Sequence, residues 1–128
     1  MLTMNKAGYI GSINERFSQQ AALELAKQFV EEVKTKGFHV RHAILFGSYA
    51  RNEQHEWSDI DVALVADEFQ SFPLLDSQLF KDIRIKKPYL AIESHTYNTD
   101  YFEKGDAFIN EEIKPKGINI ILFCYITC

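Results

Sequence analysis

An apolar run that opens with two acidic residues constrains this sequence more than any other feature. The segment DIDVALVA, residues 59–66, has the length and β-branched composition of a buried strand, yet Asp59 and Asp61 stand at its start. Side chains alternate along a strand, so these carboxylates share one face, with Cα atoms about 6.5 Å apart, while Ile60 and Val62 point into the core. Two like charges this close repel each other unless a cation lies between them. The pattern predicts a divalent-cation site. Carboxylate oxygens suit Mg²⁺, and two Mg²⁺ ions about 3.5–4 Å apart could share such a site.

A Gly-Ser pair supplies the second half of the predicted site. The run VRHAILF, residues 40–46, reads as a strand, and Gly47 ends it where the backbone must turn tightly and let a ligand approach. Ser48 begins a short helical turn whose N–H group and hydroxyl suit an anion, and Arg51 lies one turn later on roughly the same side. A phosphate cradle beside metal-binding carboxylates indicates a nucleotide site. It is not a Walker A site, because the sequence has no G-K-[ST] at this position.

The rest of the chain alternates helix-like and strand-like segments. An amphipathic pattern predicts a helix with Ser18 as its N-cap that ends near Gly37, and a second helix is predicted before Pro88. The apolar residues that mark the second helix are Leu75, Leu79, Phe80 and Ile83. Strands are predicted at 40–46, 59–66, 89–97 and 118–125, and mixed helical signals span 101–114. This alternation predicts an α/β or α+β fold in which helices cover one sheet.

The length and composition predict one globular domain. A chain of 128 residues suits a single core, and 46% hydrophobic with 25% charged residues is typical of a folded protein. Residues 1–17 show no clear period, so we expect an N-terminal arm followed by a single domain at 18–128.

Charge and hydropathy exclude several partners. A net charge of −4 argues against a duplex nucleic-acid surface, and the one dense basic run, RIKK at 84–87, is typical of a solvated helix end. The longest apolar run, 118–127, is shorter than the roughly 20 residues that a membrane span needs, and the N-terminus lacks a signal-peptide pattern. Cys124 and Cys128 read as free thiols. We therefore expect a soluble, cytoplasmic protein that contacts neither duplex nucleic acid nor membrane.

The combined motif resembles the signature of a known family. The segments GSYAR and SDIDV, with ten residues between the Gly-Ser pair and Asp59, resemble the minimal nucleotidyltransferases of the DNA polymerase beta-like nucleotidyltransferase superfamily. The resemblance runs from about Ala21 to Ile121. Members usually have Pro where Ser94 stands, and often Gly where Asn52 stands, although Asn also tolerates positive φ.

The resemblance implies a nucleotidyltransferase fold, a small mixed sheet flanked by helices, and an Mg²⁺-dependent enzyme. Such enzymes move a nucleotidyl group, here AMP from ATP, to an acceptor hydroxyl and release pyrophosphate. It also implies a third carboxylate on a later strand, for which Glu93 in YLAIESH is the candidate, against the alternative of a strand-edge Glu in solvent. The implied residues are Asp59, Asp61 and Glu93 for catalysis and a two-metal site, and Gly47, Ser48 and Arg51 for nucleotide binding.

The resemblance also suggests partners and leaves alternatives open. Antitoxin-type members are commonly encoded beside a helical HEPN-type protein, and some adenylylate it, which implies a protein acceptor and a toxin–antitoxin system. One alternative is a catalytically idle nucleotide- or partner-binding module. Another is a small-molecule transferase that modifies an antibiotic, in which a homodimer supplies the surface that a second domain usually provides. The acceptor and the base preference are not encoded in any motif of the sequence.

Four further residues are weaker candidates. His55 and Trp57 precede the acids in a position to meet the base or the acceptor, against the alternatives of a surface His and a half-buried Trp. His95 and Tyr97 follow Glu93, either lining the site or facing solvent. Two other histidines, His39 and His42, are predicted to be structural, and the apolar end INIILFCYITC is predicted to lie in the sheet or a subunit contact.

Overall fold

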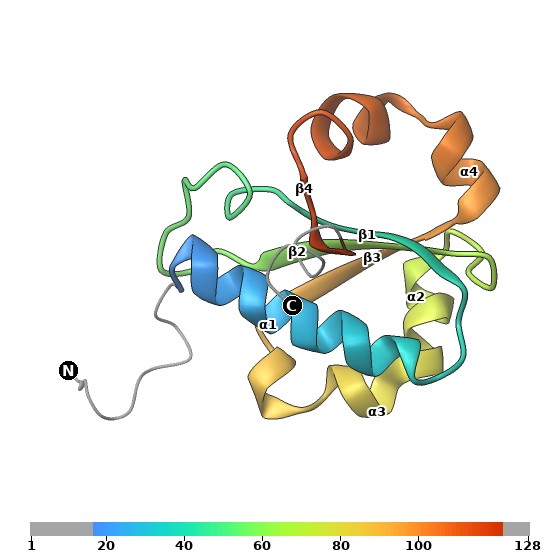
Figure 1. Ribbon diagram of the computed structural model, residues 1–128, viewed down its shortest axis with the longest axis horizontal. Helices are drawn as coiled ribbons and strands as arrows, with labels where there is room; N and C mark the ends of the chain where they lie inside the picture. The colour runs from blue at the N-terminus through green and yellow to red at the C-terminus, as the bar shows by residue number, and fades with distance from the viewer. Residues whose placement is uncertain (1–16, 122–128) are drawn as a thin grey trace.

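A four-stranded mixed sheet with helices on both faces forms the fold (Figure 1). The structure, a computed structural model, describes residues 17–121, so most of the predicted arm at 1–17 and the chain end with Cys124 and Cys128 lie outside the described residues. Its elements are α1 (Gln19–Lys34), β1 (Val40–Phe46), β2 (Ile60–Ala66), α2 (Pro73–Asp76), the 3₁₀ turn η1 (Ser77–Phe80), α3 (Lys81–Arg84), the 3₁₀ turn η2 (Lys87–Tyr89), β3 (Ile92–Asn98), α4 (Thr99–Lys104), the π-helix η3 (Ile109–Ile113) and β4 (Ile118–Asn119). The predicted α/β fold with a mixed sheet is confirmed.

The strand register brings three strand ends together at one edge of the sheet. The strand order is β3-β2-β1-β4, with β1 antiparallel to β2 and β4 and with β2 parallel to β3. Phe46 at the end of β1 pairs with Asp61, and Asp61 pairs with Glu93 near the start of β3. The Gly47 turn and both carboxylate-bearing strand starts therefore lie in one row.

Strand β2 is buried on both faces because it joins two cores. Its residues Ile60, Val62 and Leu64 pack with the buried face of α1, as predicted. Ala63 and Val65 point the other way and pack with residues of α4 and η3. Burial on both faces explains why the strand reads as a continuous apolar run, and Asp61 is its one side chain that is not buried.

Helix α1 is tied to the Gly-Ser turn at its N-terminus. Ser18 caps the helix as predicted, because its side chain accepts a hydrogen bond from the Ala21 N–H at 3.0 Å. The Gln19 side-chain amide donates to the carbonyl oxygen of Tyr49 at 3.0 Å, and the buried Tyr49 hydroxyl accepts from the Phe17 N–H at 2.9 Å. These contacts fix the turn that follows Gly47 against the helix.

The continuous second helix predicted around Leu75 and Leu79 is wrong. The segment folds as three short pieces, α2, η1 and α3, because Phe80 leaves helical geometry (φ −132°, ψ 33°) and inserts its ring beside Phe29. Phe80 and Ile83 are buried as predicted, but Leu75 and Leu79 are 53% and 51% exposed. Because of this break, Phe80 and Ile83 enter the core while Leu75 and Leu79 face solvent.

Two strand predictions also differ from the structure. The third strand begins at Ile92, three residues later than predicted, because Pro88 and Tyr89 form a 3₁₀ turn that buries the Tyr89 ring against Phe29. The last strand ends at Asn119, and the remainder of its predicted span beyond residue 121 lies outside the described residues.

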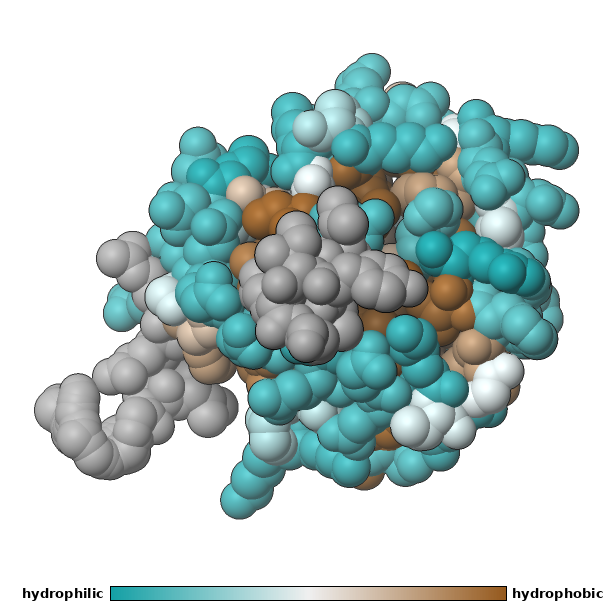
Figure 2. Space-filling view, in the orientation of Figure 1, coloured by the Kyte–Doolittle hydropathy of each residue, from teal (hydrophilic) through white to brown (hydrophobic). Residues whose placement is uncertain are grey.

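The outer surface on the side shown in Figure 2 is mostly polar. Hydrophobic residues are visible mainly in the middle of this face, between the polar outer sides of α1 and α4. Within residues 17–121, no helix has the length and apolar character needed to cross a membrane.

Asp76 should be essential for the stability of the segment between β2 and β3. Its buried carboxylate accepts hydrogen bonds from the Gln70 and Phe72 N–H groups, both at 3.0 Å, and from the Thr96 hydroxyl at 2.8 Å. We expect Asp76→Ala to lower the free energy of unfolding by about 2–4 kcal/mol, because these buried donors lose their acceptor. Urea denaturation measures the change.

Two control variants accompany this test. Asp76→Asn keeps one acceptor oxygen and should lose less stability, whereas Asp100→Ala removes an exposed carboxylate and should cost less than about 1 kcal/mol. Equal losses in Asp76→Ala and Asp100→Ala would contradict the assigned role of Asp76.

Candidate functional site

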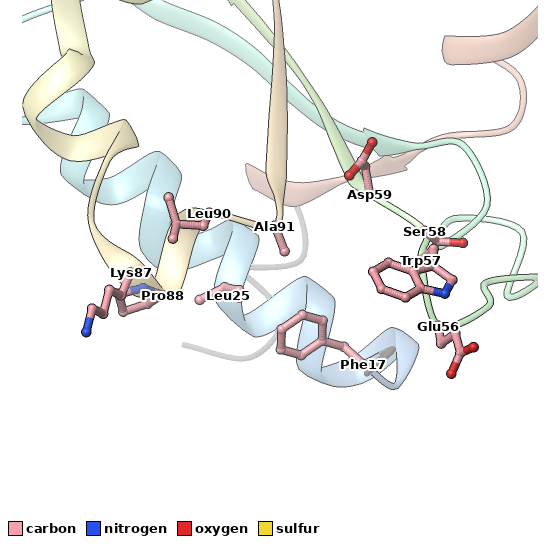
Figure 3. A pocket seen from close by; sticks show the side chains of 10 residues that line it. All are labelled: Phe17, Leu25, Glu56, Trp57, Ser58, Asp59, Lys87, Pro88, Leu90 and Ala91. Atoms are coloured by element: carbon pink, nitrogen blue, oxygen red, sulfur yellow. The ribbon is translucent and has the colours of Figure 1, made fainter. Parts of the chain in front are cut away.

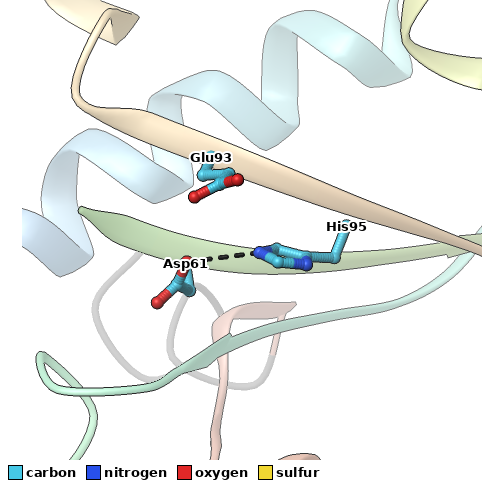
Figure 4. Close-up of side chains that lie close together, drawn as sticks. All are labelled: Asp61, Glu93 and His95. Carbon is cyan, nitrogen blue, oxygen red and sulfur yellow. Dashed lines mark hydrogen bonds and ion pairs between the residues drawn. The ribbon is translucent and has the colours of Figure 1, made fainter. Parts of the chain in front are cut away.

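Two carboxylates and one imidazole gather where β2 and β3 begin. Asp61, Glu93 and His95 each offer one ligand atom, and these atoms all lie within 4.8 Å of one another (Figure 4). Asp61 and Glu93 are register partners on neighbouring parallel strands, and His95 is two residues further along the same face of β3. Asp61 and Glu93 were both predicted as site residues from the sequence, and the structure shows that they are neighbours.

His95 belongs to this cluster rather than to the solvent-facing strand end. Its Nε2 lies 3.2 Å from Asp61 Oδ1, and its ring packs edge-on against Phe46 with centroids 4.8 Å apart. From the sequence, His95 could either line the site or face solvent. Its spacing of two residues from Glu93 was the signal that places both side chains on the same face of the strand. Tyr97, the next residue on that face, packs instead against the core beside α4.

Gly47 lies directly against the cluster. Its φ of 78° is in the left-handed region, and a Cβ atom at this position would lie 2.4 Å from Asp61 Oδ2. The following residues form a helical turn in which the Ala50 and Arg51 N–H groups donate to the Gly47 carbonyl at 3.1 and 3.2 Å. Asn52 has φ 57°, in agreement with its tolerance of positive φ. A glycine is therefore required here by both the backbone conformation and the neighbouring carboxylate.

Two predicted site residues stay apart from the cluster. Asp59 precedes β2, is exposed, and is not a member of the group that Asp61 forms. Arg51 is exposed, and its Nε donates to Glu53 Oε1 at 3.0 Å. Their roles in metal and phosphate binding remain predictions, as does that of the partly exposed Ser48.

A first cavity of about 350 Å³ opens beside Asp59. Figure 3 shows the rings of Trp57 and Phe17 facing it, with Pro88 and Leu90 on its other side. Trp57 is 63% exposed, so the half-buried Trp expected from the sequence is wrong; its ring lines this cavity instead of the core. His55 in the same loop is exposed, as expected.

A second cavity of about 500 Å³ lies beside Glu93 and also reaches Asp59. Arg84 lines it, and the buried Nε of this residue has no hydrogen-bond partner within the described part of the chain. Arg84 is the last residue of α3 and is partly exposed, as expected for a helix end, but its Nε is buried. The solvated position expected for the basic run does describe Lys86, which is exposed and pairs with Glu32 at 2.6 Å.

The two histidines predicted to be structural lie away from the cluster. His39 pairs with Glu68 at 2.5 Å on the surface, and the His42 ring packs against Phe102 with centroids 5.5 Å apart.

The donor set of the cluster fits a divalent cation. Carboxylate oxygens are preferred by Mg²⁺ and Mn²⁺, and a neutral imidazole nitrogen is an accepted ligand for many divalent metals. Asp61 and His95 are only 23% and 30% exposed at their side chains, whereas Glu93 is exposed, so the cluster is shielded from water on the Asp61 and His95 side only. Shielding strengthens the attraction between carboxylates and a cation.

Known proteins resemble this chain over most of its length. A family model described as a nucleotidyltransferase domain matches residues 26–128. Two Methanocaldococcus jannaschii proteins, each described as a "putative protein adenylyltransferase", are similar: one is 38% identical over 74 residues, covering 58% of this chain and 77% of the relative. The other is 42% identical over 52 residues, covering 41% of this chain and half of the relative. A crystal structure titled as a putative nucleotidyltransferase from Sulfolobus solfataricus shares the fold, with TM-score 0.58 and 23% identity over 91% of this chain and 90% of that one.

Replacing Gly47 should disturb the cluster without unfolding the protein. We expect Gly47→Ala to lower the affinity for Mn²⁺ roughly 10–100-fold, the range found for groups that orient metal ligands, because the new Cβ displaces the Asp61 carboxylate. Isothermal titration calorimetry with MnCl₂ measures this affinity.

Gly37→Ala is the matched control. Gly37 also has positive φ, 92°, but no atom lies within 4 Å of its Cβ position. Both variants should lose about 1–2 kcal/mol of stability from backbone strain, and only Gly47→Ala should lose cation affinity. Similar affinity in both variants would contradict the proposed contact.

Proposed function

Because this chain belongs to the nucleotidyltransferase domain family, we propose that it transfers AMP from ATP to a hydroxyl group on a protein. Membership confirms the resemblance carried by GSYAR and SDIDV. The observation that carries the proposal is the meeting of Asp61, Glu93 and the Gly47 turn at one edge of the sheet. The two M. jannaschii relatives described as protein adenylyltransferases support ATP as the donor and a protein as the acceptor.

The proposed cofactor is Mg²⁺. Asp61 and Glu93 would hold it with their carboxylates, His95 stands within reach, and Asp59 would contribute from the start of β2. When bound, the ion supplies positive charge that offsets the triphosphate and lowers the pKa of the acceptor hydroxyl.

The protein groups would then position the reactants. The Ser48 N–H and hydroxyl would hold the β- and γ-phosphates beside Gly47, where no side chain obstructs them. Arg51 would exchange Glu53 for a phosphate oxygen. His95 would act as a positioning residue, because its contact with Asp61 and its packing against Phe46 fix the Asp61 carboxylate.

Glu93 is the proposed proton acceptor. As the acceptor hydroxyl attacks the α-phosphorus, its proton passes to the Glu93 carboxylate and a new O–P bond forms. The bond between the α-phosphorus and the oxygen bridging to the β-phosphorus breaks, and pyrophosphate leaves. Positioning and charge stabilisation would account for most of the rate enhancement.

The nucleobase would occupy the first cavity. Its volume of about 350 Å³ suits a small ligand, and Trp57 and Phe17 provide aromatic faces near Asp59. Stacking of a base on an aromatic side chain contributes about 1–3 kcal/mol.

The biological setting remains part of the proposal. A HEPN-type helical protein is the proposed acceptor within a toxin–antitoxin system, and the cytoplasm, which supplies ATP and Mg²⁺, is the proposed location. A catalytically idle binding module, or a homodimeric small-molecule transferase, is the alternative that the following experiment separates from this proposal.

Asp61→Asn should abolish transfer while leaving the fold intact. With Mg²⁺ and α-phosphate-labelled ATP in host-cell lysate, the wild type should label a protein, and Asp61→Asn should label it at least about 100-fold more slowly. Asp100 is exposed, so Asp100→Asn should label the protein at the wild-type rate. Label from γ-phosphate-labelled ATP, or none from either label despite ATP binding, would contradict nucleotidyl transfer.

Trp57 should report on the nucleotide directly. It is the single tryptophan of the chain, so ATP should change the intrinsic fluorescence while tripolyphosphate should not. Trp57→Ala should weaken ATP binding about 5–150-fold, the equivalent of one stacked base, without changing tripolyphosphate binding. His55→Ala in the same loop is the control. Unchanged ATP affinity in Trp57→Ala would place the base elsewhere.

A further inference from the structure

The second cavity approaches the carboxylates from the side opposite Gly47. At this edge of the sheet the strand order places Glu93 on β3, Asp61 on β2 and Gly47 after β1. The described lining residues of the cavity come from β3, from the segment before it and from Asp59, and none comes from β1. An in-line displacement needs the attacking oxygen opposite the leaving group. With pyrophosphate at the Gly47 turn, the attacking hydroxyl would arrive past Glu93, through this cavity.

Arg84 is placed to bind an anion in this cavity. Its Nε is buried and has no acceptor among residues 17–121. Some other cations of the fold have carboxylate partners: Arg41 pairs with Asp67 at 2.5 Å and Lys36 with Asp82 at 2.7 Å. Arg84 lines the cavity and has no ion pair with a carboxylate of residues 17–121, so its guanidinium is available to an anionic ligand there. The guanidinium fork matches both carboxylate and phosphate groups, so the charge of the cavity has to decide between them.

The charge of the cavity favours a single carboxylate over a more highly charged group. Glu93 and Asp59 line the same space and are not paired with Arg84. The single positive charge of Arg84 is neutralised by one carboxylate, whereas a doubly charged phosphate monoester would leave excess negative charge beside Glu93 and Asp59. Ser77 and Ser94 add neutral hydroxyls to the lining.

Exposed apolar side chains line the cavity and occur in the segment next to it. Leu74 and Leu90 line it and are 72% and 58% exposed. Phe72, Leu75 and Leu79, from the same segment as Leu74, are each at least half exposed. Exposed apolar side chains next to a polar cavity are typical of a protein interaction site.

We propose that this cavity is the acceptor site and that Arg84 selects a hydroxyl residue with an acidic residue close to it in the acceptor protein. The proposal rests on the proposed function, which names a protein acceptor without specifying its sequence. The acceptor segment would present Ser, Thr or Tyr to Glu93, place its carboxylate on Arg84, and rest an apolar side chain on Leu74 and Leu90.

Charge-reversed variants and peptides test this selection. The full-length protein, Mg²⁺ and α-phosphate-labelled ATP are incubated with arrays of Ser, Thr and Tyr peptides that carry Asp, Asn or Lys at each flanking position. The wild type should label Asp peptides about tenfold faster than Asn peptides at one or two positions, the ratio that one charge-assisted hydrogen bond provides. Arg84→Gln should lose this preference, and Arg84→Glu should favour Lys peptides. Lys81→Gln, which removes an exposed charge from the same helix, should behave as the wild type.

A binding measurement separates failure of the inference from failure of the proposed function. Fluorescence anisotropy of a labelled Asp peptide without ATP should show weaker binding to Arg84→Gln than to the wild type. Arg84-dependent binding without any labelling would support the acidic-acceptor site and reject the transfer chemistry. Equal labelling of Asp, Asn and Lys peptides, an unchanged preference in Arg84→Glu, or label on RNA alone would overturn the inference. The switch to Lys peptides cannot arise from misfolding, because a misfolded variant would lose activity on all peptides.

Discussion

Strand β2 packs against helices on both faces, and this double burial fixes the positions of the surrounding elements relative to Asp61. Its neighbours β1 and β3 must keep their register, because a shift of one residue would exchange the side chains that enter the two cores. The same register sets Phe46 and Glu93 opposite Asp61. The hydrophobic cores thus determine the spacing of the polar cluster, although none of its residues belongs to them.

The cluster places two carboxylates side by side on neighbouring strands. Asp61 and Glu93 are carboxylates on adjacent strands, and the missing side chain of Gly47 leaves the space that the Asp61 carboxylate occupies beside β1. His95 offers partial compensation through its contact at 3.2 Å. Such an arrangement is costly in a purely structural role and favourable when positive charge is bound, which is the physical basis of the proposed chemistry.

Local patterns in the sequence predicted the elements whose structure is determined locally. Strand β1 and the cap of α1 agree with the sequence to the residue, and β2 begins one residue later than predicted. The break in the second helix could not be read locally, because it depends on contacts of Asp76 with Thr96, twenty residues away, and on the packing of Phe80 beside α1. The sequence similarly indicated Asp61, Glu93 and Gly47 as site residues, but the proximity of His95 and Arg84 follows from strand register and from the path of the crossover.

The crossover between β2 and β3 consists of short turns rather than one helix, and this has an evolutionary consequence. The Gly47 turn and Asp61 belong to β1 and β2, whereas Arg84 and the exposed leucines belong to the crossover. Short turns accept insertions and substitutions more readily than a continuous helix, whose residues are coupled through shared hydrogen bonds. Descendants of such a chain can therefore acquire new acceptors by altering the crossover while inheriting the same donor chemistry unchanged.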